Sequence, residues 1–199
     1  MTSTPAPAPP ATDAPPKRRR HVVVPAVSGA VTVLLLGAPA KGCESPAGGP
    51  VLSETAFREH VRHTQDAGGD AVRRLGIDPA TVVDRKEMGH PSCKDDLGVD
   101  ADGVTRDQPS VTWEPDFAGR AAYVAAVTTL REEWSARGMT VRDVPAPAEG
   151  EPGAGLPGVR ATDDHGIELS LGPDWLSGEP ALVADGGCVR HRGYLVDWE

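Results

Sequence analysis

The side chains best suited to metal chemistry are two histidines, His60 and His63, which lie three residues apart beside Glu59. Two imidazoles at that spacing on one helix can share a transition-metal ion. No third ligand occurs at a matching distance in the sequence, and Arg58 and Arg62 flank the pair. The preferred interpretation is therefore a solvated, charged helix face.

A second group of candidate ligands is acidic. The segment DDLGVDADG places four aspartates before Gly103, namely Asp95, Asp96, Asp100 and Asp102. When the last two aspartates and Gly103 take the third, fifth and sixth positions of a calcium-binding EF-hand loop, Pro109 falls at the twelfth position, where a glutamate is required. The segment is not an EF-hand, and a solvated acidic loop is favoured over a looser calcium site.

Residues for nucleophilic catalysis do not form a recognisable set. Ser92 and His90 are close in sequence, but the chain has no Gly-x-Ser-x-Gly elbow and no phosphate-binding glycine loop after a strand. Asp163, Asp164 and His165 look like a triad fragment, yet such residues before a glycine are typical of turns. We predict no catalytic residue, no metal ligand and no cofactor. The alternative is a metal-dependent binder or hydrolase that uses the histidines and the acidic loop.

Aromatic side chains are scarce, at 4% of the residues, so each tryptophan carries weight in the interpretation. The four are Trp113, Trp134, Trp175 and Trp198. Trp134 continues a helical apolar stripe and is expected in the core. Trp175, within GPDWLSG, is the candidate for a binding aromatic.

The N-terminal segments predict export. Residues 1–20 form a Pro- and Ala-rich region without a packable core that ends in the basic cluster Lys17-Arg18-Arg19-Arg20. Residues 21–43 contain the uncharged run VVVPAVSGAVTVLLLGAPA and form a signal peptide or a membrane anchor. The basic cluster favours the cytoplasmic side, so residues 44–199 are expected outside the cytoplasm.

Three outcomes of export remain open, two of which attach the chain to the membrane. Ala40-Lys41-Gly42-Cys43 resembles a bacterial lipobox, although Lys41 is charged where the pattern has a small residue, so lipidation of Cys43 ranks first. Retention of the apolar run as a single anchor helix ranks second, because its length is close to the roughly 20 residues that span a bilayer. Free secretion, after cleavage at a small-x-small site, ranks third.

The charge distribution excludes nucleic acid as an expected partner. Beyond Cys43 the chain has 15 basic and 28 acidic residues, a net charge of −13. Such a surface repels phosphate backbones. We expect attachment to the cell membrane at its extracytoplasmic face, with a protein or cell-wall component as ligand.

The cysteine count agrees with this location. If Cys43 carries a lipid, Cys93 and Cys188 remain to form one disulfide, which is favoured over two small buried thiols in an oxidising compartment. The bridge would tie the loop after the first strand to the last part of the domain.

The elements that position these side chains predict an α+β domain over 53–199, preceded by a flexible tether over 44–52. Apolar periodicity predicts helices over 53–75 and from 117 or 119 to 137, with a weak point at Gly68-Gly69. Alternation and turn residues predict strands in the ranges 81–87, 111–114, 140–144, 158–162, 167–171, 181–184 and from 189 onward. The expected architecture is two helices packed on one face of a mainly antiparallel sheet.

The expected core lies between the two helices and the sheet. Its predicted members are Tyr123, Val127, Leu130 and Trp134 on the second helix, facing Phe57, Val61 and Leu75 on the first. The Pro- and Gly-rich segment 145–157 has little to bury and is predicted to be a mobile surface loop.

Several short motifs resemble a known family. The tethered helix, SCKDDLG, YVAAVTTLREEW before a small-residue stop, DHGIELSLG and a late GGC together are similar to small actinobacterial lipoproteins of unknown function, over roughly residues 30–190. The resemblance implies an envelope-located α+β domain with one disulfide and brings no catalytic residues. The sequence thus favours a membrane-anchored, non-catalytic binding or interaction module of the cell envelope.

Overall fold

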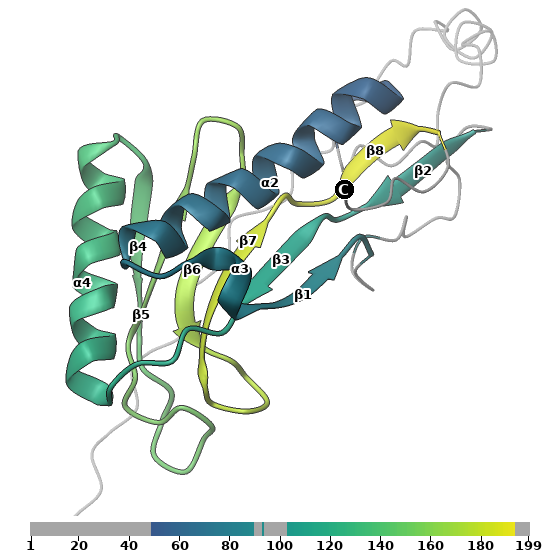
Figure 1. Ribbon diagram of the computed structural model, residues 1–199. Helices are drawn as coiled ribbons and strands as arrows, with labels where there is room; N and C mark the ends of the chain where they lie inside the picture. The colour runs from purple at the N-terminus through teal and green to yellow at the C-terminus, as the bar shows by residue number, and fades with distance from the viewer. Residues whose placement is uncertain (1–48, 90–92, 94–102, 194–199) are drawn as a thin grey trace, which may run out of the picture. The chain divides into compact units, whose positions relative to one another are not determined.

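The computed structural model describes residues 49–89, 93 and 103–193 (Figure 1). They all belong to one compact unit, Gly42–Glu199. The basic cluster, the apolar run, Cys43 and the acidic segment 95–102 lie outside the described residues. Within the described part of the chain, no helix combines the length and hydrophobicity needed to cross a membrane.

The main element is a six-stranded sheet in which every neighbouring pair of strands is antiparallel. Its strand order is β1-β3-β7-β6-β5-β4, with the bounds β1 Val83–Glu87, β3 Ser110–Trp113, β7 Pro180–Asp185, β6 Glu168–Pro173, β5 Gly158–Thr162 and β4 Thr140–Val144. A separate antiparallel ladder pairs β2 (Val104–Asp107) with β8 (Val189–Arg192). The predicted antiparallel sheet is confirmed.

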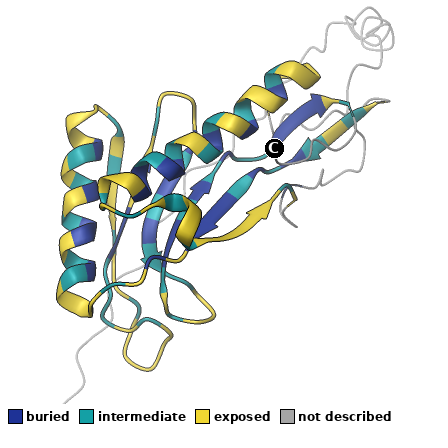
Figure 2. Cartoon of the chain, viewed as in Figure 1, coloured by how far each residue is buried: buried dark blue, intermediate teal, exposed yellow. Residues whose placement is uncertain are grey.

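Two long helices, α2 (Glu54–Arg74) and α4 (Arg120–Ala136), cover the same face of this sheet (Figure 1). The register pairs Trp113 with Leu182 and Leu182 with Leu171, so their side chains point to one face. These side chains form one buried cluster with residues of both helices. Figure 2 shows the buried positions concentrated on the inner sides of the helices. The α+β layer architecture is confirmed.

The stripe of α4 is buried as predicted. Tyr123, Val127, Leu130 and Trp134 are each at most 1% exposed. The helix ends where Gly138 adopts a φ of 78°, a left-handed conformation that favours glycine. Helical periodicity was a sufficient signal here because the residues recur every three or four positions on a single face.

The predicted weak point in α2 is a packing position. Ser53 caps the helix by accepting from the Ala56 amide at 3.2 Å, and the helix runs unbroken through Gly68 and Gly69. A Cβ on Gly68 would overlap the ring of Trp113. Glycine therefore lets the Trp113 ring lie directly on the helix backbone, and the contact offsets the low helix propensity of the residue.

The predicted strand over 81–87 begins late. Residues Pro79–Val82 form a one-turn helix, α3, with proline in its first turn and the Asp78 carboxylate accepting from the Ala80 amide at 3.0 Å. Proline and an N-terminal cap are strong local signals for a helix start, and they override the β-branched residues that follow. Strand β2 was also not predicted, because in VTRD a single apolar residue is followed by three polar ones and no alternation is visible.

The predicted position of Phe57 and Val61 is wrong. These side chains form a second cluster with Val189 of β8, whereas Ala71 and Val72 of the same helix belong to the main core. The helix is 21 residues long, and its first half lies beside β8 while its second half lies on β3 and β7 (Figure 1). The apolar stripe of α2 therefore contributes side chains to both buried clusters.

The disulfide Cys93–Cys188 is present, with Cα atoms 5.3 Å apart. It fixes residue 93 to the residue that precedes β8. The predicted pairing is confirmed.

Candidate functional site

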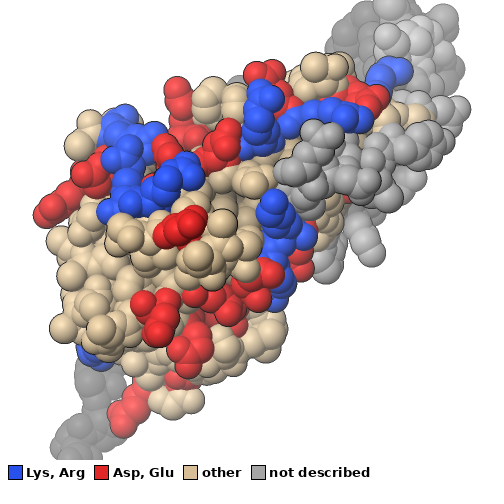
Figure 3. Space-filling view, viewed as in Figure 1, with Lys and Arg blue, Asp and Glu red and all other residues tan. Residues whose placement is uncertain are grey.

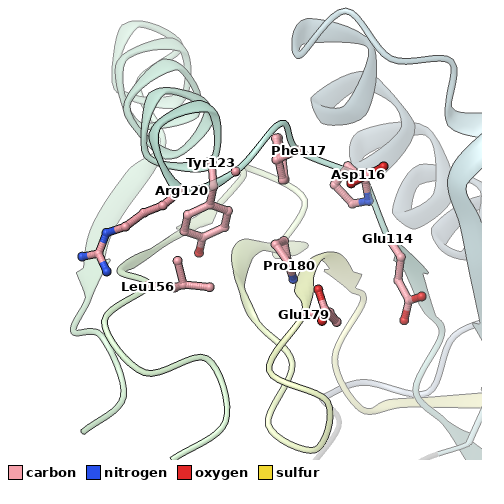
Figure 4. A pocket seen from close by; sticks show the side chains of 10 residues that line it. Glu114, Asp116, Phe117, Arg120, Tyr123, Leu156, Glu179 and Pro180 are labelled. Carbon is pink, nitrogen blue, oxygen red and sulfur yellow. The ribbon is translucent and has the colours of Figure 1, made fainter. Parts of the chain in front are cut away.

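A cleft of about 380 Å³ opens where the start of α4 meets the β3–α4 connection and the β6–β7 loop (Figure 4). One wall is apolar and consists of Phe117, Tyr123, Leu156 and Pro180. Three carboxylates, those of Glu114, Asp116 and Glu179, also line it. Sequence analysis did not identify this cleft.

Strand pairing explains why the carboxylates converge. The register that pairs Trp113 with Leu182 brings Glu114 and Glu179 to the same end of β3 and β7. The Glu114 amide donates to the Val82 carbonyl at 2.8 Å, which fixes its backbone beside α3. Asp116 follows two residues later in the connection to α4. The three side chains thus come from two segments of the chain, 114–116 and the region of Glu179, which are more than 60 residues apart.

A ring contact and a hydrogen bond hold the aromatic wall of the cleft. Phe117 and Tyr123 meet edge to face, with ring centroids 5.6 Å apart. The Tyr123 hydroxyl donates to the Pro157 carbonyl at 2.6 Å, and burial raises the pKa of Tyr123 to about 12. This hydroxyl stays protonated at neutral pH and its hydrogen is already engaged. Tyr123 is therefore a wall of the cleft, with no free proton for acid–base chemistry.

The loop over 145–157 lies at the surface, as its composition predicts, and is held by hydrogen bonds of its own. The Ala148 amide donates to the Glu151 carboxylate at 2.8 Å, and the Gly155 amide donates to the Pro147 carbonyl at 3.3 Å. Leu156 packs against the main core. The segment therefore has one side chain to bury and supplies part of the cleft wall.

The carboxylates of the cleft are not neutralised by a described lysine or arginine. Glu114, Asp116 and Glu179 are exposed, and none forms an ion pair with a described basic side chain. The Arg120 guanidinium points away from them in Figure 4 and lies over Gly155. In Figure 3, acidic side chains gather over this end of the molecule. The cleft therefore has a negative potential.

The β6–β7 loop presents Trp175 on a fixed turn. The Asp174 carboxylate accepts from the Leu176 and Ser177 amides, both at 2.9 Å. The backbone hydrogen bond from Ser177, the larger effect, and that from Leu176 lower the pKa of Asp174. Trp175 and Leu176 are 78% and 66% exposed at the tip. The exposed position fits the predicted role of Trp175 as a binding aromatic.

The histidines predicted to share a helix face have different neighbours. His60 Nε2 lies 2.7 Å from the Gly186 carbonyl, and because a carbonyl only accepts, this nitrogen carries the hydrogen. His63 lies beside His165, whose turn is held by the Asp163 carboxylate accepting from the His165 and Ile167 amides. The predicted turn chemistry of Asp163 is confirmed, and the triad fragment is not a triad.

A buried histidine was missed entirely. His191 of β8 is 0% exposed, and its Nε2 lies 2.8 Å from the Asp107 carboxylate of β2. Its ring stacks on Phe57 with centroids 3.7 Å apart, and its Nδ1 has no partner among the described residues. No sequence signal indicates the pair, because its members are 84 residues apart and β2 itself was not predicted.

Among the residues that the structure describes, no group of three or more His, Cys, Asp and Glu side chains is placed to hold a metal ion. Comparisons of the chain with protein-family models, with curated proteins and with solved structures find no match. The expected similarity to actinobacterial lipoproteins stays a prediction.

Proposed function

We propose that this chain is an exported protein, held at the extracytoplasmic face of the cell membrane by a lipid on Cys43, that binds an amine-bearing ligand without converting it. The observation that carries the proposal is the cleft at the start of α4, where carboxylates that no described basic side chain pairs with lie beside an apolar wall. A preformed, partly apolar cleft with a few converging polar groups is the usual form of a ligand site.

The disulfide supports the location. Disulfides persist mainly in oxidising compartments outside the cytoplasm. Cys93 and Cys188 are bonded to each other, which leaves Cys43 as the remaining cysteine of the three. The basic cluster, the apolar run and the Gly-Cys at its end agree with lipidation at that residue.

The energetics favour a ligand with both a charge and an apolar body. An ion pair at an exposed site contributes only about 0.2–1 kcal/mol. Each buried methylene contributes about 0.8 kcal/mol, so contact with Phe117, Tyr123 and Leu156 adds a comparable amount. A lysine side chain or an alkylamine combines the two features, whereas an anion of the same size meets only repulsion from Glu114, Asp116 and Glu179.

Binding is favoured over catalysis because of what lines the cleft. Its hydroxyl group, on Tyr123, is engaged with the Pro157 carbonyl and has a raised pKa. The remaining described polar side chains are exposed carboxylates and an arginine that points away. These groups recognise charge and do not supply an activated nucleophile.

The binding proposal is tested with three probes that share one carbon chain. The full chain in detergent micelles is titrated with hexylamine, hexanol and hexanoate, and binding is followed by NMR shifts of the Phe117 and Tyr123 rings. We expect hexylamine to bind best and hexanoate least. Equal binding of the three probes, or no shift at these rings, would refute the proposed site.

A matched pair of variants assigns the effect to the cleft. Glu114→Gln removes one carboxylate from the cleft, and Glu132→Gln removes an exposed carboxylate from the outer face of α4. We expect the first to weaken hexylamine binding and the second to leave it unchanged. If both weaken it equally, general charge attraction explains the binding and the cleft is not the site.

The anchor is tested separately by cell fractionation. Cys43→Ser should leave export intact and release the domain into the medium. A wild-type protein found only in the cytosol would overturn the export proposal. A Cys43→Ser protein that stays in the membrane would instead identify the apolar run as the anchor.

A further inference from the structure

His63 and His165 come from different parts of the fold and meet at the surface. His63 lies in the middle of α2, and His165 lies in the turn between β5 and β6. Their ring centroids are 4.6 Å apart, and the rings are tilted by 44°. Their side chains are 34% and 55% exposed, so an ion from solvent can reach both.

The ring separation matches that of two imidazoles on one metal ion. Rings that share an ion at metal–nitrogen distances of about 2.0–2.1 Å, at angles between a right angle and a tetrahedral angle, have centres about 4.5–5.2 Å apart. The observed 4.6 Å lies within that range.

Carboxylates next to the two rings favour a cation. Glu59 Oε1 lies 3.9 Å from His63 Nε2, and Asp164 Oδ1 lies 3.8 Å from His165 Nε2. At these distances neither carboxylate is hydrogen-bonded to its ring, but each adds negative charge beside it. His60, which is tied to the Gly186 carbonyl, lies outside this arrangement.

We propose that His63 and His165 together bind one late first-row divalent transition-metal ion, with water in the remaining coordination positions. Imidazole ligands select such ions over Ca²⁺ and Mg²⁺, and the expected order of affinity is Cu²⁺ above Ni²⁺ and Zn²⁺. A bound ion would cross-link α2 to the β5–β6 turn. This site is separate from the cleft and does not depend on its ligand.

The test titrates Cu²⁺, Ni²⁺, Zn²⁺ and Ca²⁺ into the full chain in detergent, purified without a histidine tag. Calorimetry should give one Cu²⁺ per chain, weaker Zn²⁺ binding and no Ca²⁺ binding. The electron paramagnetic resonance spectrum of the Cu²⁺ form should show coupling to two imidazole nitrogens. A spectrum with oxygen ligands alone, or no bound Cu²⁺, would overturn the proposal.

Variants distinguish this pair from the other histidines. His63→Asn and His165→Asn each remove one exposed ring and should each abolish the single Cu²⁺ equivalent while circular dichroism stays native. His60→Gln and His90→Gln serve as controls and should leave the equivalent intact. The assignment to His63 and His165 would be overturned in either of two cases. A folded His60→Gln or His90→Gln variant would no longer bind the Cu²⁺ equivalent, or both the His63→Asn and the His165→Asn variants would still bind it.

Discussion

The six-stranded sheet is covered by apolar side chains from both long helices. The β2–β8 ladder instead rests on three buried apolar residues, the partly buried Leu52 and Met88, and a polar pair. In the main core, Trp134 and Trp113 are the largest buried side chains. Beside the ladder, Phe57 packs with Val61 and Val189 and stacks on His191, which faces Asp107. The two regions therefore depend on different interactions.

This difference shows how a short ladder can persist without a large core. Three buried apolar side chains supply too little area to fix two four-residue strands alone. The disulfide to Cys188 and the His191–Asp107 contact add constraints at the start and within β8. The main sheet should be destabilised most by the removal of buried side-chain volume. The ladder should be destabilised most by the removal of the disulfide or of the His191–Asp107 contact.

Truncation of Trp134 should have the largest effect. Trp134→Ala removes a side chain that is 0% exposed and should cost about 3–5 kcal/mol, enough to threaten the domain. Trp134→Phe is the control and should cost less, because Trp134 Nε1 has no partner among the described residues. Urea denaturation measures both. If Trp134→Ala lowered the free energy of unfolding less than Trp134→Phe does, Trp134 would not be a core residue.

Removal of the disulfide should rank next. Replacing Cys93 and Cys188 by serine opens a loop of 95 residues and should cost about 2–4 kcal/mol. Hydrogen exchange should accelerate first in β8, since Cys188 directly precedes it, and only later in β5 and β6. Equal acceleration in all strands would show that the ladder and the main sheet unfold as one unit.

Loss of the buried carboxylate should have a smaller effect. Asp107→Ala leaves His191 without its acceptor in a site that is 0% exposed and should cost about 1–3 kcal/mol. Asp107→Asn keeps a polar side chain of the same shape and should cost less. Chemical denaturation of the two variants gives the comparison. An alanine variant as stable as wild type would show that the polar pair does not support the ladder.

The smallest effect should come from the β6–β7 loop, outside both cores. Asp174→Ala should cost less than about 1 kcal/mol at neutral pH, because it removes exposed hydrogen bonds. The folded state lowers the pKa of Asp174 below its ordinary 3.8, so its contribution is present above that pH and lost as the pH falls through the folded pKa. The melting temperatures of variant and wild type should therefore converge in acid. A constant difference would argue against the carboxylate as the cause.

The sequence predicted the parts of the fold that rest on local signals. Periodicity located α4, and Ser53 and Gly138 marked helix ends. Strands β5 and β6 follow one another through a turn with clear aspartate and glycine signals. The cysteine pair followed from the expected compartment. Each of these predictions used either residues that are neighbours in the sequence or the number of cysteines.

The rest depends on contacts between distant segments. Strand β2 is too polar to identify without β8, and Phe57 was misplaced because its neighbour Val189 is distant in sequence. The cleft was missed for the same reason, since Glu114 and Glu179 meet only through the β3–β7 pairing. Leu156 is similar: nothing in its loop indicates that it reaches the core.

The position of β7 in the sheet has a consequence for the order of folding. β7 lies between β3 and β6, although only β8 follows it along the described chain. The successive strands β4, β5 and β6 can pair as soon as they are available, but β1 and β3 join them only through β7. A chain that emerges N-terminus first therefore holds two half-sheets, not yet hydrogen-bonded to each other, with exposed edges until residue 185 has emerged. Any stop before Pro180 would leave β3 and β6 as free edges able to pair with other chains.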